Sequence, residues 1–147
     1  MLFISGMNLK AQTNEDSLAI QKACKDYTEG WYEGNIDRVS NSLSEELVKR
    51  TIRMDQNGVD QVINMSASQL ISWTKSNREE GSVTRLKDLE PGKEFKPDIM
   101  IYDICGHFAS VKIAIEKYGF FDYCHLVKLN GKWKIFHALY GPLPQEN

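Results

Sequence analysis

The chain has 147 residues, of which 41% are hydrophobic and 26% are charged, as is ordinary for a globular protein. Its 18 basic and 20 acidic residues leave a net charge of −2 and form no basic stripe, so we expect no nucleic-acid partner. No apolar run is long enough to span a bilayer, and we expect no membrane partner. The three cysteines have no metal-binding spacing, and we expect neither a metal nor a cofactor.

Residues 1–13 are expected to lie outside the folded domain. The apolar stretch from Leu2 to Leu9, followed by Ala11, resembles the end of a signal peptide, but no basic segment precedes it. The segment is therefore either a flexible arm or a signal-peptide remnant. The protein would be exported or periplasmic in the second case and cytoplasmic otherwise. Residues 14–147 are expected to form a single domain.

The first part of that domain is predicted to be helical. Thr13 is expected to cap a helix that ends at Gly34, and Asn35 is expected to cap a second, short helix. The apolar stripe of the first helix has helical spacing and comprises Ile20, Cys24, Tyr27 and Trp31.

A strand over residues 46–53, a turn and a short strand over 59–65 are predicted next. Ser66 and Gln69 form a predicted capping box for a third helix, which is expected to end near Gly81. Residues 82–97 contain prolines and many charges and are expected to form a loop over a pocket mouth.

The last third of the chain alternates between apolar and polar residues, which predicts a meander of strands. The predicted strands are 98–105, 108–117, 120–129 and 132–140. The order of elements indicates an α+β fold, with helices on one face of an antiparallel sheet.

The turns of the meander predict which side chains face inward. With Asn130-Gly131 as a two-residue turn, Leu126 opposes Ile135 and Cys124 opposes His137. Turns at Gly106-His107 and Tyr118-Gly119 extend the assignment to the other two strands. The predicted inner face is Met100, Tyr102, Ile104, Val111, Ile113, Ile115, Asp122, Cys124, Leu126, Trp133, Ile135, His137 and Leu139.

The opposite face of the predicted sheet is unusually aromatic. It is expected to hold Phe121, Tyr123, His125, Phe136 and Tyr140. An apolar patch of this kind is typical of an interface, so we predict a homodimer through this face. Cover by the N-terminal arm of the same chain is the alternative.

Several segments resemble a known family. They are Tyr27-Thr28-Glu29-Gly30-Trp31-Tyr32-Glu33-Gly34-Asn35, Leu47-Val48-Lys49-Arg50, Phe108-Ala109-Ser110-Val111-Lys112 and the block from Asp122 to Ile135. Through them the chain resembles the putative lumazine-binding family of the nuclear transport factor 2-like, SnoaL-like superfamily, over roughly residues 16–142. The resemblance implies a cone-shaped, cystatin-like fold, in which a curved antiparallel sheet packs on three N-terminal helices around an internal pocket. It also implies dimerisation through the outer sheet face.

Asp122 and His137 are the candidate catalytic residues. A carboxylate among apolar residues needs a partner, and His137 is predicted to lie diagonally across the hairpin. The pair could act as an acid and a base on a ligand, or it could simply tie two strands together.

The remaining candidate site residues are predicted to bind a ligand. Tyr27, Trp31 and Tyr102 could present flat faces to an apolar or aromatic ligand, or they could be core residues. Arg50 could bind an anionic group, pair with Asp122, or pair with a glutamate at the surface. Besides these, the predicted pocket wall includes Cys124 and Trp133.

Three functional hypotheses follow from these residues. The first is a small-molecule-binding protein with an apolar, aromatic pocket and an Asp–His pair. The second is an isomerase, cyclase or lyase of the same fold that uses Asp122 and His137. The third is an exported protein-interaction module. The fold alone does not decide among them, because one fold hosts many functions.

Overall fold

The computed structural model describes residues 6–79 and 96–144 of the chain. Within these residues lie three α-helices and six strands, as the sequence predicted, and one short 3-10 helix that it did not predict. In chain order they are α1 (Gly6–Glu33), α2 (Ile36–Ser42), β1 (Leu43–Met54), β2 (Asp60–Ser66), α3 (Ala67–Glu79), β3 (Asp98–Cys105), β4 (Phe108–Ile115), η1 (Glu116–Tyr118), β5 (Phe120–Leu129) and β6 (Lys132–Pro142).

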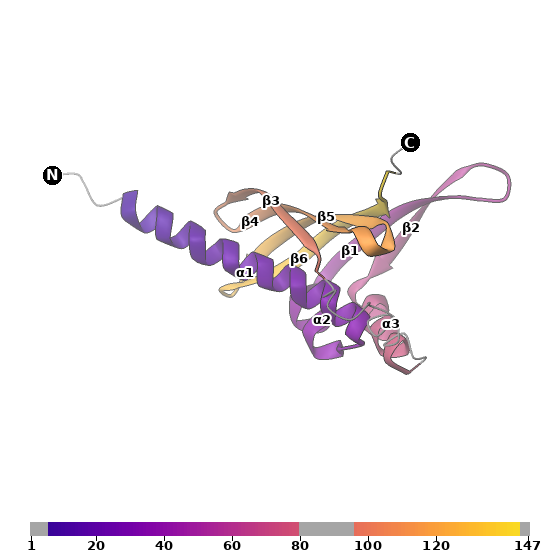
Figure 1. Ribbon diagram of the computed structural model, residues 1–147, viewed down its shortest axis with the longest axis horizontal. Coiled ribbons are helices and arrows are strands. Elements are labelled where there is room, and N and C mark those ends of the chain that lie inside the picture. The colour runs from indigo at the N-terminus through magenta and orange to yellow at the C-terminus, as the bar shows by residue number, and fades with distance from the viewer. Residues whose placement is uncertain (1–5, 80–95, 145–147) are drawn as a thin grey trace.

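The six strands form one curved sheet in the order β2-β1-β6-β5-β4-β3. Neighbouring strands are antiparallel except β1 and β6, which run parallel and join the two halves of the chain. Figure 1 shows α1 crossing one side of this sheet, with α2 and α3 at one end. The predicted α+β class, with helices on one face of the sheet, is therefore confirmed.

The first helix begins earlier than the sequence predicted. It starts at Gly6, so Thr13 lies within the helix and does not cap it. Residues 7–12 are mostly good helix formers and include no glycine or proline, which explains why the helix continues through them. The N-terminal turns of α1 extend past the edge of the sheet in Figure 1.

The helix ends follow the predicted capping chemistry. Gly34 has a φ of 64° directly after α1, and the Asn35 side chain accepts a hydrogen bond from the Arg38 backbone N–H. The Ser66 backbone N–H donates to Gln69 Oε1 at 2.9 Å, and the Gln69 N–H donates to Ser66 Oγ at 3.3 Å. This reciprocal pair is the predicted capping box of α3.

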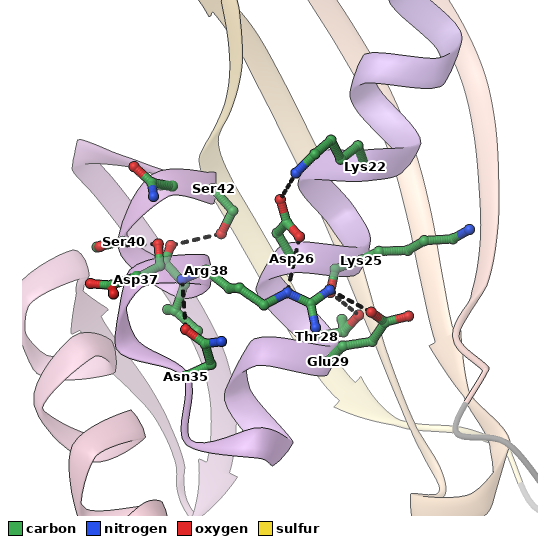
Figure 2. A network of polar contacts seen from close by, with 12 residues as sticks. Lys22, Lys25, Asp26, Thr28, Glu29, Asn35, Asp37, Arg38, Ser40 and Ser42 are labelled. Carbon is green, nitrogen blue, oxygen red and sulfur yellow. Dashed lines mark hydrogen bonds and ion pairs between the residues drawn. The ribbon is translucent and has the colours of Figure 1, made fainter.

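An arginine joins α2 to α1. The Arg38 guanidinium donates to Asp26 Oδ1 at 3.0 Å, to Glu29 Oε2 at 2.5 Å and to Glu33 Oε2 at 2.8 Å. Figure 2 shows the guanidinium reaching from α2 to Asp26 and Glu29. The helices approach closely here, because a Cβ placed on Gly30 would lie 2.9 Å from Arg38 Cβ. Gly30 is therefore a contact residue between the two helices.

The predicted turns and faces of the β5–β6 hairpin are correct near its tip. Asn130 and Gly131 have φ values of 49° and 76°, as a two-residue hairpin turn requires. Leu126 pairs with Ile135, and Lys128 with Trp133. At the other end of β5, Ile113 pairs with Asp122 and not with Cys124, because η1 makes the preceding turn longer than predicted. This shift of two residues keeps the same side chains inside.

A β-bulge in β6 changes the face of the residues beyond it. His125 pairs with His137, although Leu126 pairs with Ile135, so Phe136 is an extra residue in β6. The predictions for the four residues after Phe136 are therefore wrong. His137 and Leu139 lie on the outer face, whereas Ala138 and Tyr140 lie on the inner face.

A second bulge has the same effect on β3. Ile101 pairs with Val111 and Asp103 with Ser110, so Tyr102 is the extra residue. Met100 and Tyr102 are consequently 51% and 54% exposed, and the prediction that they face the core is wrong. Ile101 packs against the core in their place, together with Ile99.

The core lies between the inner face of the sheet and the three helices. Its most deeply buried apolar residues include Ile20, Cys24, Val39, Val111, Ile113, Cys124, Leu126 and Ile135. The predicted end of α3 near Gly81 and most of the predicted loop 82–97 lie outside the described residues. No helix among the described residues has the length and hydropathy to cross a membrane.

Candidate functional site

A pocket opens between the inner face of the sheet and the helices. Its volume is about 610 Å³, which is within the usual range for a small-molecule site. Residues of α1, β1, β2, α3, β4, β5 and β6 line it, together with η1. The lining residues are Tyr27, Thr28, Trp31, Tyr32, Lys49, Arg53, Ile63, Met65, Leu70, Trp73, Ile115, Tyr118, Gly119, Phe120, Asp122, Tyr140, Gly141 and Pro142.

A buried ion pair lies in the wall of this pocket. Lys49 Nζ is 2.6 Å from Asp122 Oδ1, and the two side chains are only 9% and 1% exposed. Lys49 Nζ also donates a hydrogen bond to the Tyr27 hydroxyl at 2.6 Å. Charges removed from water in this way need a partner of opposite sign, and each member of this pair supplies it for the other.

Three elements bring these groups together. Lys49 faces inward because alternate residues of β1, from Leu47 through Lys49 to Thr51, are buried. Tyr27 lies on the buried stripe of α1, four residues before Trp31. Asp122 lies on β5 opposite Ile113 and Tyr140, both on the inner face.

The ammonium of Lys49 stays protonated. Burial by itself would lower the pKa of Lys49, but the Tyr27 oxygen and the Asp122 carboxylate outweigh it, and the pKa is raised. Burial and the Asp122 charge raise the pKa of Tyr27. Lys49 is therefore a fixed cation, and the Tyr27 hydroxyl keeps its proton.

Asp122 retains a capacity to accept hydrogen bonds. Asp122 Oδ1 has the Lys49 ammonium as its partner at 2.6 Å, and a carboxylate oxygen can accept a second donor. No other donor among the described residues bonds to this buried oxygen. The second lone pair of this oxygen is an acceptor for a donor group of a ligand.

Aromatic rings form much of the pocket wall. The Tyr140 ring lies under the Lys49 ammonium, 4.5 Å from ring centroid to Nζ, in a cation–π contact. Tyr32 and Tyr118 stack with their centroids 4.5 Å apart and their planes at 14°. With Trp31, Trp73 and Phe120 they give the pocket flat apolar surfaces.

Three of the predicted site residues, Asp122, Tyr27 and Trp31, line the pocket together. Their predicted roles in binding or catalysis stay predictions. The predicted pairing of Asp122 with His137 is wrong, because the bulge at Phe136 turns His137 to the outer face.

On the outer face His137 contacts Arg50 and not Asp122. Its Nε2 lies 3.2 Å from Arg50 Nη1, and its ring stacks on His125 with centroids 5.6 Å apart. Burial, His125 and Arg50 all lower the pKa of His137. Arg50 also donates a hydrogen bond to the Asn64 side chain. It does not line the pocket, although the sequence predicted it as a ligand-binding residue.

The other predicted ligand-binding residues also lie elsewhere. Tyr102 is exposed at the bulge in β3. Trp133 is buried near the hairpin tip, where its Nε1 donates to Asp16 Oδ1 at 2.9 Å. Cys124 is buried behind the pocket wall, and burial followed by the Asp122 charge raises the pKa of its thiol. It therefore remains a protonated packing group.

The prediction missed Lys49, Arg53 and Tyr140. One signal was present, because a buried carboxylate at Asp122 requires a cation and β1 offers both Lys49 and Arg50. Each face of this strand combines one cation with β-branched or aliphatic residues. The two faces are Leu47-Lys49-Thr51 and Val48-Arg50-Ile52. Sequence alternation alone therefore could not decide which cation faces Asp122.

Within residues 6–79 and 96–144, no group of three or more His, Cys, Asp and Glu side chains could hold a metal ion. The site instead combines one buried ion pair, one hydroxyl and a set of aromatic walls.

The sequence matches the model of a family described as "Putative lumazine-binding" over residues 15–141. The chain belongs to this family. No curated protein matches it. The description of the family is that of ligand-binding proteins.

Solved structures share the fold. A nuclear transport factor 2-like protein with a cystatin-like fold from Novosphingobium aromaticivorans has a TM-score of 0.67 at 8% identity, covering 99% of this chain and 94% of its own. A nuclear transport factor 2-like protein of unknown function from Silicibacter pomeroyi has a TM-score of 0.63 at 16% identity, covering 88% of this chain and 98% of its own. One from Shewanella baltica, also of unknown function, has a TM-score of 0.59 at 19% identity, covering 89% of this chain and 96% of its own. The predicted nuclear transport factor 2-like fold is therefore confirmed.

Proposed function

We propose that this protein binds a small, flat, largely apolar ligand in the pocket around Lys49 and Asp122. The observation that carries the proposal is a pocket of about 610 Å³ with aromatic walls and a buried carboxylate oxygen, Asp122 Oδ1, that has no donor besides Lys49 among the described residues. A ring compound with an N–H or O–H group would pack on the aromatic walls and supply a second donor to that oxygen.

The family description supports a ligand of this kind. Lumazine is a flat, fused two-ring heterocycle that carries ring N–H groups and carbonyl oxygens. Its N–H groups are donors that Asp122 Oδ1 can accept beside Lys49, and its flat rings match the aromatic walls. Lumazine therefore shares the flat rings and the N–H donors of the proposed ligand, but it is a more polar compound.

The protonation states favour binding over catalysis. Lys49 holds its proton and is neither a base nor a nucleophile near neutral pH. Burial and the nearby Asp122 charge raise the pKa of Cys24 to about 12, and the pKa of Cys124 is also raised, so neither thiol is a ready nucleophile. His137, the predicted acid or base, lies on the other face of the sheet.

A pair of neighbouring residues on β2 tests the proposal. Ile63 lines the pocket, whereas Val62 is exposed on the outer face. The uncharged aromatic dye N-phenyl-1-naphthylamine serves as the probe, and its fluorescence reports binding. We expect the wild-type protein and Val62→Trp to bind the dye, and Ile63→Trp, which fills the pocket, to lose most of the binding. Equal binding by all three proteins would contradict the proposal.

The outer sheet face supports a second part of the proposal, a homodimer. Tyr123, Phe136 and Leu139 are exposed on neighbouring strands, and Ile52 and Val62 continue the surface across β1 and β2. Of the residues predicted for this face, Tyr140 is excluded, because it lies inside. Apolar surface shared by several strands is suited to packing against a second copy about a twofold axis.

The mass of the protein in solution tests this part. Light scattering after gel filtration should give a dimer for the wild-type chain and a monomer for Leu139→Glu. Leu18 is also exposed but lies on α1, so Leu18→Glu is the matched control and should remain a dimer. A wild-type monomer at micromolar concentration would contradict the dimer.

A further inference from the structure

We propose that the ligand of this pocket is an anion, and that Arg53 at the pocket mouth binds its negative group. This inference rests on the proposed binding function and adds the charge of the ligand to it. It follows from the position of Arg53, from the balance of charges in the pocket and from the contacts that hold the guanidinium.

Arg53 shares a strand face with Lys49. Residues 49, 51 and 53 of β1 alternate onto the inner face; Lys49 and Thr51 are buried there, and Arg53 is exposed. Four residues of extended chain separate the two cations by about 13 Å along the strand. Both residues line the pocket. Because Lys49 is buried and Arg53 is exposed, Lys49 marks the closed end of the pocket and Arg53 marks its mouth.

The charges that line the pocket do not cancel. Among the described lining residues, Lys49 and Arg53 are cations and Asp122 is the one carboxylate. The Asp122 charge is balanced by Lys49 at 2.6 Å. No carboxylate of the described residues forms an ion pair with Arg53. The positive charge at the mouth is therefore left for a ligand, and an apolar wall beside it strengthens its field.

The contacts of Arg53 leave most of its donors available. Its Nη2 donates to the Tyr140 hydroxyl at 3.3 Å. The ring of the same tyrosine lies beside Lys49, so Tyr140 spans from the closed end to the mouth. A guanidinium has five N–H donors, and those not used by Tyr140 can bind a carboxylate or sulfonate.

These positions describe an elongated ligand. Its flat, apolar part would pack between the aromatic walls near Lys49 and Asp122, and its anionic group would meet Arg53. A cationic ligand would instead bring its charge toward the unbalanced guanidinium. The class we infer is therefore an aromatic or fused-ring acid.

Two dyes of nearly the same shape test the charge. The first is the anion 1-anilinonaphthalene-8-sulfonate. The second is N-phenyl-1-naphthylamine, which has the same ring system without the sulfonate and is uncharged. Only binding that is lost in Ile63→Trp is counted, which removes any contribution from the outer face. We expect the wild-type protein to bind the sulfonate about 10- to 100-fold more tightly than the uncharged dye, as an ionic hydrogen bond would give.

Two arginines on the same strand supply the variant and its control. Arg53→Gln should weaken binding of the sulfonate by the same 10- to 100-fold and leave the uncharged dye unchanged. Arg50 faces the opposite side and bonds to Asn64, so Arg50→Gln should change neither affinity. Thermal unfolding of each variant shows that it remains folded.

The outcomes separate this inference from the proposed function. Equal affinities of the wild-type protein for the two dyes would overturn the inference and leave the proposed function intact. So would equal losses of both dyes in Arg53→Gln. Failure of both dyes to bind in the pocket would overturn the proposed function and the inference together.

Discussion

Lys49 Nζ and Asp122 Oδ1 lie 2.6 Å apart inside the molecule, joining β1 to β5 across the intervening strand β6. Both side chains are buried, and Tyr27 from α1 accepts a hydrogen bond from the same ammonium. One cation thus connects the first helix with two strands that are far apart in sequence.

Breaking this ion pair should be costly. Lys49→Met and Asp122→Leu should each lower the free energy of unfolding by about 3–5 kcal/mol, because each leaves a buried charge without its partner. The double variant should lose less than the two single losses combined, since no charge remains buried. Urea unfolding measures all three proteins. The exposed pair Lys22–Asp26 is the control, and Lys22→Met should cost under about 1 kcal/mol.

Gly30→Ala should destabilise the contact between α1 and α2. Alanine favours a helix over glycine by about 1 kcal/mol, but the new methyl would lie 2.9 Å from Arg38 Cβ and 3.1 Å from Val39 Cγ2. Crowding of this kind costs about 1–3 kcal/mol, so we expect a net loss in the free energy of unfolding. A rise in the denaturation midpoint would show that the helices separate easily at this point.

Asp16 should anchor α1 to the β5–β6 hairpin. Its Oδ1 accepts from Lys128 Nζ at 2.7 Å and from Trp133 Nε1 at 2.9 Å. Asp16→Ala should cost about 1–3 kcal/mol, because the buried indole N–H loses its acceptor. Denaturant unfolding measures the loss, and Glu15→Ala on the same helix, at an exposed position, should have little effect.

The Asp16 carboxylate should make the stability of the protein depend on pH in the acid range. Burial by itself would raise the pKa of Asp16, but the Lys128 and Trp133 hydrogen bonds lower it below 3.8. The unfolded chain then binds the proton more readily, so the stabilisation is present above about pH 4 and is lost as the pH falls through the folded-state pKa. Asp16→Ala should therefore unfold with a weaker pH dependence in this acid range. An unchanged dependence would contradict the role of this group.

His137 should reduce stability in mild acid. Burial, the neighbouring His125 and the Arg50 charge lower its pKa from 6.5 in the folded protein. As the pH falls, His137 of the unfolded chain is protonated first. The stability that neutral His137 contributes is therefore present above about pH 6.5 and is lost below it. His137→Phe should show a smaller decrease in the urea midpoint between about pH 7 and about pH 5. Equal decreases in the two proteins would contradict the shifted pKa.

The sequence predicted the elements well because their signals are local. Gly34, Asn35, Ser66 and Asn130-Gly131 each end, cap or turn the chain through their own backbone and side-chain chemistry. The strand boundaries of the meander follow from the turns between them. Even the wrong register between β4 and β5 preserved the inner face, because it differed by two residues.

The site was harder to predict because it depends on bulges and on contacts between distant elements. A single extra residue at Phe136 moved His137 out and Tyr140 in, and Tyr102 did the same for β3. No glycine or turn residue marks either position. The partner of Asp122 is Lys49 of β1, some 70 residues earlier in the chain. Whether Lys49 or Arg50 faces Asp122 depends on strand pairing that only the fold shows.

The position of a bound ligand in the protein can be located by NMR. Amide and side-chain NMR shifts of the wild-type protein can be followed while N-phenyl-1-naphthylamine is added. We expect the largest changes at Tyr27, Lys49 and Trp73, which line the pocket. Changes confined to Phe136 and Leu139 on the outer face, with none at Lys49, would contradict binding in the pocket.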